Sequence, residues 1–395
     1  MTLLSEIYDV TLKRDIRGAA KGGFIRPTVG EHFMTHRDFE EIVSWIRLQN
    51  TKLYTTNIIA TGDPKIATLG ANKICISYLK NTAVYTVIAT IDGDNIILGD
   101  TYTVSPATTN GHMHNAILVF DSERIIYTNR HNNNPFVGRV TVGTVSDTSI
   151  SFGTEQTYTV YNANYPTLTK IGNTQVAFTY VDGGDIKVKL GTVNTNSITF
   201  SNEATLVDNI NAFNLNTLKM NDTTLFIAYS DQVDYVGRAI IAKINDTTIT
   251  SGIPYTFYND NIGGSTDAYI ASCLIAPNKV FLVYSLYSSY NLFYCIATIT
   301  NTEISFSEGY RLTSSVTNYL SADMVDNKLV LIYKKDNLIK SMVGIIDGET
   351  IIFEDEVALT DGSNFYNSTI KLTNSDFCTG IVHNGYVSLL KTYLN

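Results

Sequence analysis

Short runs in which apolar and polar residues alternate fill most of the chain from residue 51 onward, and turns rich in Asn, Asp and Gly separate them. An alternating run that is rich in β-branched and aromatic residues predicts a β-strand. One segment has a helical period instead: Phe39, Ile42, Val43 and Ile46 recur at i, i+3, i+4 and i+7, and Thr35 stands at the N-cap position. The pattern therefore predicts an all-β protein that follows a short arm with one helix.

The predicted strands repeat along the chain. A small residue, a β-branched residue, a polar turn and a closing Ile occur together six times, with the Ile at positions 96, 150, 198, 249, 304 and 351. This composition is typical of a tight hairpin between two strands. A polar turn followed by a β-rich run that usually ends in Tyr lies half a unit earlier and occurs seven times, as in 173–180 and 222–229. A repeat of about 50 residues with four strands predicts the blade of a β-propeller.

The count of the two repeated segments predicts how the ring closes. Seven copies of the second segment but only six hairpins indicate seven blades, of which the last lacks its outer strand. Such a blade would leave an unpaired edge. Residues 52–59, directly after the helix, resemble the outer-strand segments 101–104 and 157–160. We therefore expect 52–59 to close the last blade, and we divide the chain into an arm at 1–50 and a propeller at 51–395.

Composition narrows the class of protein further. The chain has 28 Lys and Arg against 37 Asp and Glu, a net charge of −9, and is 44% hydrophobic but only 16% charged. Low charge excludes a disordered chain, and the shortage of basic residues argues against a nucleic-acid partner. No apolar run is long enough to predict a membrane span. The first 50 residues are neutral, and their apolar stripe predicts a docking face made of Phe39, Ile42, Val43, Trp45 and Ile46.

Cysteines and histidines give little evidence for a metal or a cofactor, and we expect neither. The three residues His112, His114 and His131 fall in adjoining segments, but no carboxylate stands at a spacing that would complete a metal site. The cysteines lie in or beside apolar runs without C-x-x-C spacing, which predicts buried core thiols. They are Cys75, Cys273, Cys295 and Cys378.

One face of the predicted propeller has the composition of a binding surface. Turns within the first and last strand pairs of a blade lie on one face, whereas the second-to-third loops and the loops between blades lie on the other. The latter loops are longer, irregular and rich in Tyr, Asn, Asp and Ser. Tyr offers rigid amphipathic area and the polar residues offer hydrogen bonds, which suits a sugar or a protein surface, although these are also ordinary loop residues in an Asn-rich chain. The candidate ligand-binding residues are His112, His114, Arg130, His131, Tyr161, Tyr165, Asp234, Tyr235, Tyr258, Tyr287 and Tyr290.

Motifs for catalysis are not found in the sequence. It contains no Gly-x-Ser-x-Gly elbow, no zinc-protease motif and no Ser-x-Asp-x-Gly-x-x-Trp box of sialidase-like propellers. Carboxylates are plentiful, so a glycosidase pair stays open. On this evidence the sequence predicts a protein that is not an enzyme.

The layout of a short arm and helix before a Tyr-, Asn- and Thr-rich all-β domain resembles that of bacteriophage virion proteins such as tail fibres, receptor-binding proteins and head fibres. The resemblance implies that residues 1–50 attach to other virion proteins, that the propeller loops bind a host-surface glycan or protein, and that the protein resides in the phage particle. It also implies a homo-oligomer such as a trimer, with no nucleic-acid or membrane partner. The alternative is a free carbohydrate-binding or carbohydrate-active, glycosidase-like propeller.

Overall fold

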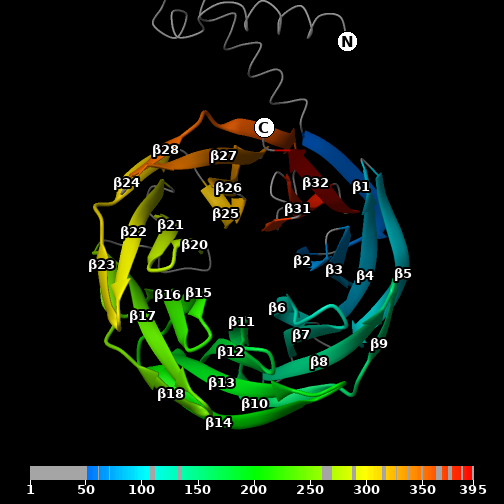
Figure 1. Ribbon diagram of the computed structural model, residues 1–395, viewed down its shortest axis with the longest axis horizontal. Helices are drawn as coiled ribbons and strands as arrows, with labels where there is room; N and C mark the ends of the chain where they lie inside the picture. The colour runs from blue at the N-terminus through cyan, green and yellow to red at the C-terminus, as the bar shows by residue number, and fades with distance from the viewer. Residues whose placement is uncertain are drawn as a thin grey trace, which may run out of the picture. The chain divides into compact units, whose positions relative to one another are not determined.

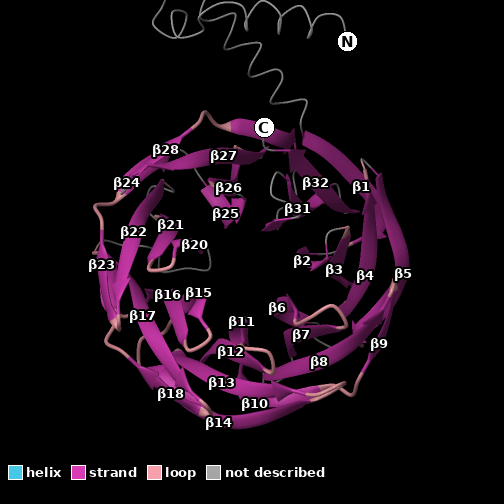
Figure 2. Cartoon of the chain, viewed as in Figure 1, coloured by secondary structure: helices cyan, strands magenta, loops and turns pink. Residues whose placement is uncertain are grey.

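The chain folds into a ring of seven antiparallel sheets (Figure 1), and almost all of the described chain is strand or tight turn (Figure 2). This confirms the predicted seven-bladed β-propeller. The computed structural model describes residues 51–393 apart from 61, 71, 94, 107–111, 132–135, 260–268, 287–290, 314–316, 326, 337, 348–349, 362–366, 372–375 and 384–385. In this part of the chain no helix has the length and apolar character needed to span a membrane.

The predicted arm lies outside the described residues, and so do its helix and the docking residues Phe39, Ile42, Val43, Trp45 and Ile46. Its role in attachment therefore stays a prediction.

The first three blades follow the chain in order. Blade 1 contains β2 (Gly62–Gly70), β3 (Lys73–Lys80), β4 (Ala83–Asp92) and β5 (Asn95–Ser105). Blade 2 contains β6 (His112–Val119), β7 (Arg124–His131), β8 (Val137–Ser146), β9 (Ser149–Phe152) and β10 (Gln156–Asn162). Blade 3 contains β11 (Asn164–Ile171), β12 (Gln175–Asp182), β13 (Asp185–Val193) and β14 (Ile198–Val207).

The remaining four blades complete the ring. Blade 4 contains β15 (Phe213–Asn221), β16 (Thr224–Asp231), β17 (Val236–Asn245), β18 (Thr248–Ser251) and β19 (Tyr255–Tyr258). Blade 5 contains β20 (Ile270–Ala276), β21 (Lys279–Ser285), β22 (Leu292–Thr300), β23 (Glu303–Phe306) and β24 (Tyr310–Thr313). Blade 6 contains β25 (Thr317–Val325), β26 (Lys328–Lys335), β27 (Leu338–Asp347), β28 (Thr350–Phe353) and β29 (Val357–Asp361). Blade 7 contains β30 (Asn367–Lys371), β31 (Asp376–His383), β32 (Tyr386–Tyr393) and β1 (Thr51–Ile59).

Blade 7 is closed by the strand that precedes blade 1. Its strand order is β1-β32-β31-β30, so the N-terminal β1 lies outermost beside the last strand of the chain. The Thr56 hydroxyl donates a hydrogen bond of 2.6 Å to the Val387 carbonyl. Ile58 and Ala60 are buried in an apolar cluster with residues of blades 1 and 7. The predicted closure by residues 52–59 is confirmed.

Apolar clusters join every pair of neighbouring blades. Clusters of buried side chains lie between blades 1 and 2, 2 and 3, and so on around the ring to blades 7 and 1. The Tyr that ends several second strands belongs to these interfaces: Tyr180, Tyr229, Tyr284 and Tyr333 are all fully buried. Cys75, Cys273, Cys295 and Cys378 are buried and unpaired, as the sequence predicts.

The two faces of the propeller are defined by their connections. The prediction that the second-to-third connections are longer is wrong for blades 1 and 3, where they are two-residue turns. On the hairpin face, defined by the first-to-second and third-to-fourth turns of each blade, tight turns place Asp147, Asp246 and Asn301 at φ of 55°, 54° and 60°. Asp and Asn tolerate this left-handed conformation better than other residues. The loop face is defined by the second-to-third connections and the connections between blades.

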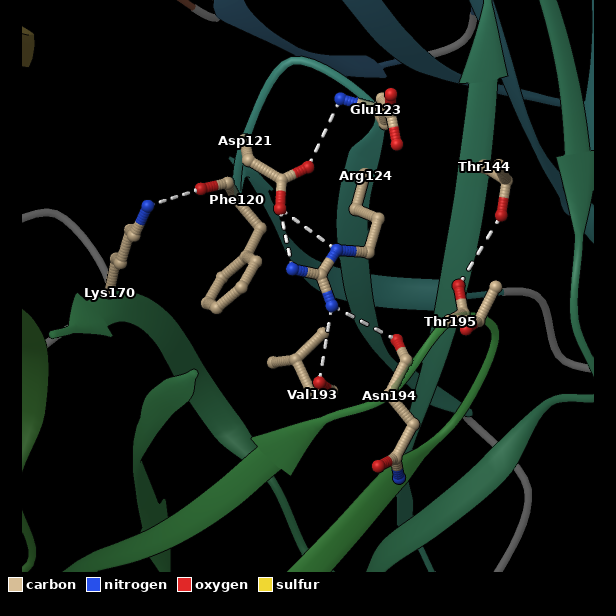
Figure 3. A network of polar contacts seen from close by, with 9 residues as sticks. All are labelled: Phe120, Asp121, Glu123, Arg124, Thr144, Lys170, Val193, Asn194 and Thr195. Atoms are coloured by element: carbon tan, nitrogen blue, oxygen red, sulfur yellow. Dashed lines mark hydrogen bonds and ion pairs between the residues drawn. The ribbon is translucent and has the colours of Figure 1, made fainter. Parts of the chain in front are cut away.

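A polar network on the hairpin face joins blade 2 to blade 3 (Figure 3). Arg124 donates to the Asp121 carboxylate through Nε at 2.9 Å and reaches the Val193 carbonyl of the next blade at 3.2 Å. The Lys170 ammonium, also from blade 3, donates to the Phe120 carbonyl at 2.7 Å. Both cations lie 4.8 Å from the centre of the Phe120 ring. The network is a structural clamp, because its donors are directed at backbone and side chains of the protein itself.

Candidate functional site

Five residues at the loop-face junction of blades 2 and 3 make up the best candidate for a binding site. We call them the blade 2–3 group: Arg130, Phe136, Tyr161, Asn164 and Tyr165. Arg130 is at the end of β7, Phe136 precedes β8, Tyr161 is near the end of β10, and the other two begin β11. Asn162 lies opposite Val137 in the sheet, so the strand ends that carry Tyr161 and Phe136 lie side by side.

Arg130 is the buried cation of this group. It is 9% exposed, donates from one terminal nitrogen to Oδ1 of Asn164, and lies with Cζ 4.9 Å from the centre of the Phe136 ring. Burial lowers the pKa of the guanidinium, while the nearby phenols of Tyr165 and Tyr158 act in the opposite direction. An arginine remains charged at neutral pH despite such a shift. The guanidinium is thus held in one place between a loop and the next blade.

Tyr165 owes its position to an irregularity in β11. Asn164 lies opposite Val181 and Thr167 opposite Thr179, so the strand has a bulge between them. Tyr165 sits in this bulge at φ 49°, a strained conformation for a tyrosine. Its ring centre is 5.8 Å from that of Phe213, and burial raises the pKa of its phenol to about 12. Tyr165 is therefore a neutral side chain held in place near Arg130, and it does not act as an acid or a base.

Two members of the group present aromatic surface to solvent. Tyr161 is 65% exposed and Phe136 is 36% exposed. Aromatic faces of this kind pack against the apolar C–H faces of sugar rings, while guanidinium and amide groups hydrogen-bond to hydroxyls and carboxylates. The group therefore combines a stacking surface with a fixed cation, which is an arrangement for binding.

His131 is engaged in a joint between blades 1 and 2. Its Nε2 lies 3.3 Å from both the Ser105 hydroxyl and the Glu155 carboxylate, and Ser105 donates to Glu155 at 2.6 Å. Burial would raise the pKa of Glu155, but the hydrogen bonds from His131 and Ser105 lower it overall. A catalytic triad needs the His between the hydroxyl and the acid, through different ring nitrogens. Here one nitrogen faces both partners, so the arrangement is structural.

The predicted metal-site histidines other than His131 are His112 and His114. His112 lies opposite His131 in the ladder of β6 and β7, and His114 follows two residues later. The side chains of His112 and His114 lie outside the described residues. Among the side chains that are described, no group of three or more His, Cys, Asp or Glu is arranged to hold a metal ion.

The remaining predicted residues are dispersed. Tyr235 is 50% exposed on blade 4, and Asp234 beside it pairs with Arg238. Tyr258 packs instead between blades 4 and 5, with its ring centre 5.4 Å from that of Tyr284. Tyr287 and Tyr290 lie outside the described residues.

Sequence reasoning missed two members of the group and a repeated polar motif. Phe136 and Asn164 were not predicted, although Asn164 lies in the same Tyr- and Asn-rich segment as Tyr161. The repeated motif joins the Tyr of a second strand to an acid and a base: the Tyr333 hydroxyl donates to Glu356 at 2.5 Å, and Lys335 lies 3.1 Å from the same carboxylate. Glu203 plays the same part in blade 3. The regular recurrence of Tyr was the available signal.

Comparison with known proteins shows the fold alone. No protein-family model matches the sequence, and no curated protein sequence matches it. A structure of a protein from Lactobacillus plantarum is similar with a TM-score of 0.57 at 9% identity, over 78% of this chain and 86% of that one. A putative 6-phosphogluconolactonase from Bacteroides uniformis is similar with a TM-score of 0.52 at 11% identity, over 73% and 83%. A prolyl endopeptidase structure matches 87% of this chain with a TM-score of 0.48 at 13% identity, but this chain spans only 47% of its length.

These matches overturn the prediction that the protein is not an enzyme. That prediction rested on missing sequence motifs, yet the propellers similar to this chain include one named as a lactonase at only 11% identity. At such identity an active site need not preserve a recognisable motif, since one fold hosts many chemistries. The prediction of a protein without activity is therefore wrong and is not retained.

Proposed function

We propose that the propeller binds a carbohydrate on its loop face, at the blade 2–3 group, and belongs to the carbohydrate-binding or carbohydrate-active propellers. The observation that carries the proposal is the fixed Arg130, buried against Asn164 and the Phe136 ring, next to the exposed ring of Tyr161. A rigid cation and amide beside aromatic faces suit a ligand with both apolar faces and many oxygens, and sugars have that chemistry.

The charge of the group favours one class of sugar. Arg130 supplies a positive charge within the group, and the field of a partly desolvated cation attracts a carboxylate or phosphate at the adjoining surface. We therefore expect acidic sugars, such as uronic acids or sugar phosphates, to bind here in preference to neutral ones.

The experiment is a glycan panel that contains acidic and neutral oligosaccharides, probed with the full-length protein. Tyr161→Ala removes the most exposed ring and should weaken binding about tenfold, the effect expected for a lost aromatic contact. Ile253→Ala is the matched control, because Ile253 is 66% exposed and lies on the outer rim of blade 4. It should leave binding unchanged.

The same panel, analysed for cleaved products, detects carbohydrate turnover as well as binding. Absence of binding to every glycan, or equal loss in Tyr161→Ala and Ile253→Ala, contradicts the proposal. Attachment to a virion through residues 1–50, residence in the phage particle and oligomerisation stay predictions from the sequence, and carbohydrate recognition is compatible with each of them.

A further inference from the structure

The loop between β16 and β17 of blade 4 presents apolar side chains to solvent on the loop face. Val233 is 59% exposed and Tyr235 is 50% exposed, while Gln232 between them and β16 is buried. Both side chains stand on one four-residue loop between Asp231 and Val236, so they place apolar surface together at a single point of the loop face.

This loop is fixed by a buried carboxylate. Asp231 is 1% exposed, and its Oδ1 accepts hydrogen bonds from the backbone N–H groups of Val233 at 2.9 Å and Asp234 at 3.2 Å. Arg238 lies 2.7 Å from the other oxygen of Asp231 and also pairs with Asp234. The Gln232 amide donates to the Ser230 hydroxyl at 2.6 Å. The loop is therefore preorganised, so a ligand would not have to order it on binding.

The conformation of Tyr235 is unfavourable for the isolated chain. Its φ is 59°, a left-handed value that costs a bulky residue about 1 kcal/mol or more. Gly or Asn would adopt this φ with less strain. In this conformation Tyr235 is half exposed, and it directly follows Asp234, the partner of Arg238.

Blade 3 shows that the framework of blade 4 does not require this loop. Asp182 ends its second strand as Asp231 does, and Lys187 pairs with Asp182 at 2.8 Å as Arg238 pairs with Asp231. Two glycines, Gly183 and Gly184, make the entire connection. In blade 4 the same connection has the four residues 232–235. Closing the hairpin therefore requires neither the two additional residues nor the strained tyrosine.

We propose that residues 233–238 of blade 4 are a second sugar-contact site, separate from the blade 2–3 group, which takes a neutral sugar ring. The ring stacks on Tyr235, and its hydroxyls bond to the Asp234 carboxylate and the Arg238 guanidinium. Two carboxylates face one guanidinium here, so the site carries net negative charge and disfavours the acidic sugars that Arg130 attracts. This inference rests on the proposed function, of which it specifies a second ligand class.

Two loop variants of the full-length protein test it on the same glycan panel. In the first, Gln232–Tyr235 are replaced by Gly-Gly, which copies the connection of blade 3. The second is Tyr235→Asn, which removes the ring and introduces a residue that tolerates the left-handed conformation. We expect both to fold, Tyr235→Asn with an unfolding midpoint equal to or above that of the wild type because it relieves the strain, and both to bind neutral glycans about tenfold more weakly. Binding of acidic glycans should be unchanged.

The outcomes separate the two proposals. Loss of binding in Tyr161→Ala but not in the loop variants refutes the second site and leaves the blade 2–3 group standing, whereas the reverse pattern refutes the blade 2–3 group alone. No binding of any glycan by the wild type refutes both. If the loop variants change only the association of the protein with itself in sedimentation experiments, the loop is a protein contact and the sugar assignment is wrong.

Discussion

Among single residues, the repeated Tyr of the second strands is the one whose role the structure changes most. The sequence pattern places this Tyr at the end of a strand, close to loops that have the composition of a binding surface. In the structure, Tyr180 and Tyr333 are buried between blades, and each donates its hydroxyl to a carboxylate, Glu203 or Glu356. A buried hydroxyl left without a partner costs about 1–3 kcal/mol, so the acid on the outer part of the blade is needed to complete the packing.

Glu356 gives a pH dependence whose sign follows from its contacts. Burial would raise its pKa, but hydrogen bonds from Lys340, Tyr333 and Lys335 lower it below its ordinary value. A carboxyl with a lowered pKa in the folded state adds stability above its unfolded pKa, and this contribution is lost as the pH falls through the folded value. We expect the midpoint temperature of wild-type unfolding to decrease once the pH is lowered below about 5. Glu356→Gln should cost roughly 1–2 kcal/mol at pH 7 and show a shallower decline on acidification.

The control for this prediction is Glu303→Gln, because Glu303 is exposed on β23. Thermal unfolding followed by circular dichroism between pH 7 and pH 3 measures both effects. Identical pH profiles for the wild type and Glu356→Gln contradict the prediction.

For whole strands and turns, the sequence predicted what depends on local pattern and repeat. Alternation and period predicted the strands, the seven blades and the closing strand, because each of these features follows from neighbouring residues or from the number of repeated units. It did not predict the division of the outer strand into two short strands in blades 2, 4, 5 and 6, nor the bulge that turns Tyr165. These depend on shifts of register between paired strands, which the alternation of side chains within one strand does not specify. Composition selected Arg130, Tyr161 and Tyr165 for the candidate site, whereas Asn164 was missed because its contact with Arg130 joins two blades.

The closing strand β1 allows a direct test at this level. A chain of residues 51–395 keeps β1, and a chain of residues 60–395 lacks it and leaves β32 as an unpaired edge. We expect the first to unfold like the full-length protein and the second to unfold at a temperature lower by on the order of 10 °C and to self-associate through the exposed edge. A synthetic peptide of residues 51–59 should restore the midpoint of the shorter chain, because it can add as an edge strand. Equal midpoints for the two chains would show that closure contributes nothing.

In the molecule as a whole, the ring makes the stability of each blade depend on its neighbours. Buried clusters occupy all seven interfaces between blades, and each cluster formed by the described residues draws side chains from two neighbouring blades. The hairpin face adds polar clamps to these interfaces: Arg124 reaches blade 3, and Lys73 of blade 1 pairs with Asp147 of blade 2. The loop face also has polar joints between blades, from Arg130 to Asn164 and from His131 to Ser105, so both faces hold the ring, and the exposed side chains of the loop face are the ones free to bind a ligand.

Arg124→Ala tests whether one clamp acts on the entire ring. Arg124 holds Asp121 within blade 2 and the Val193 and Asn194 carbonyls of blade 3, so its loss weakens the interface between the two blades by roughly 1–2 kcal/mol. Because a closed ring cannot release one blade without opening two interfaces, we expect a single unfolding transition at a lower denaturant concentration, with an unchanged slope. Arg311→Ala, at an exposed position on β24, should remain within about 0.5 kcal/mol of the wild type. An additional early transition in Arg124→Ala would instead show that blades 2 and 3 separate locally, and that the seven blades do not unfold as one unit.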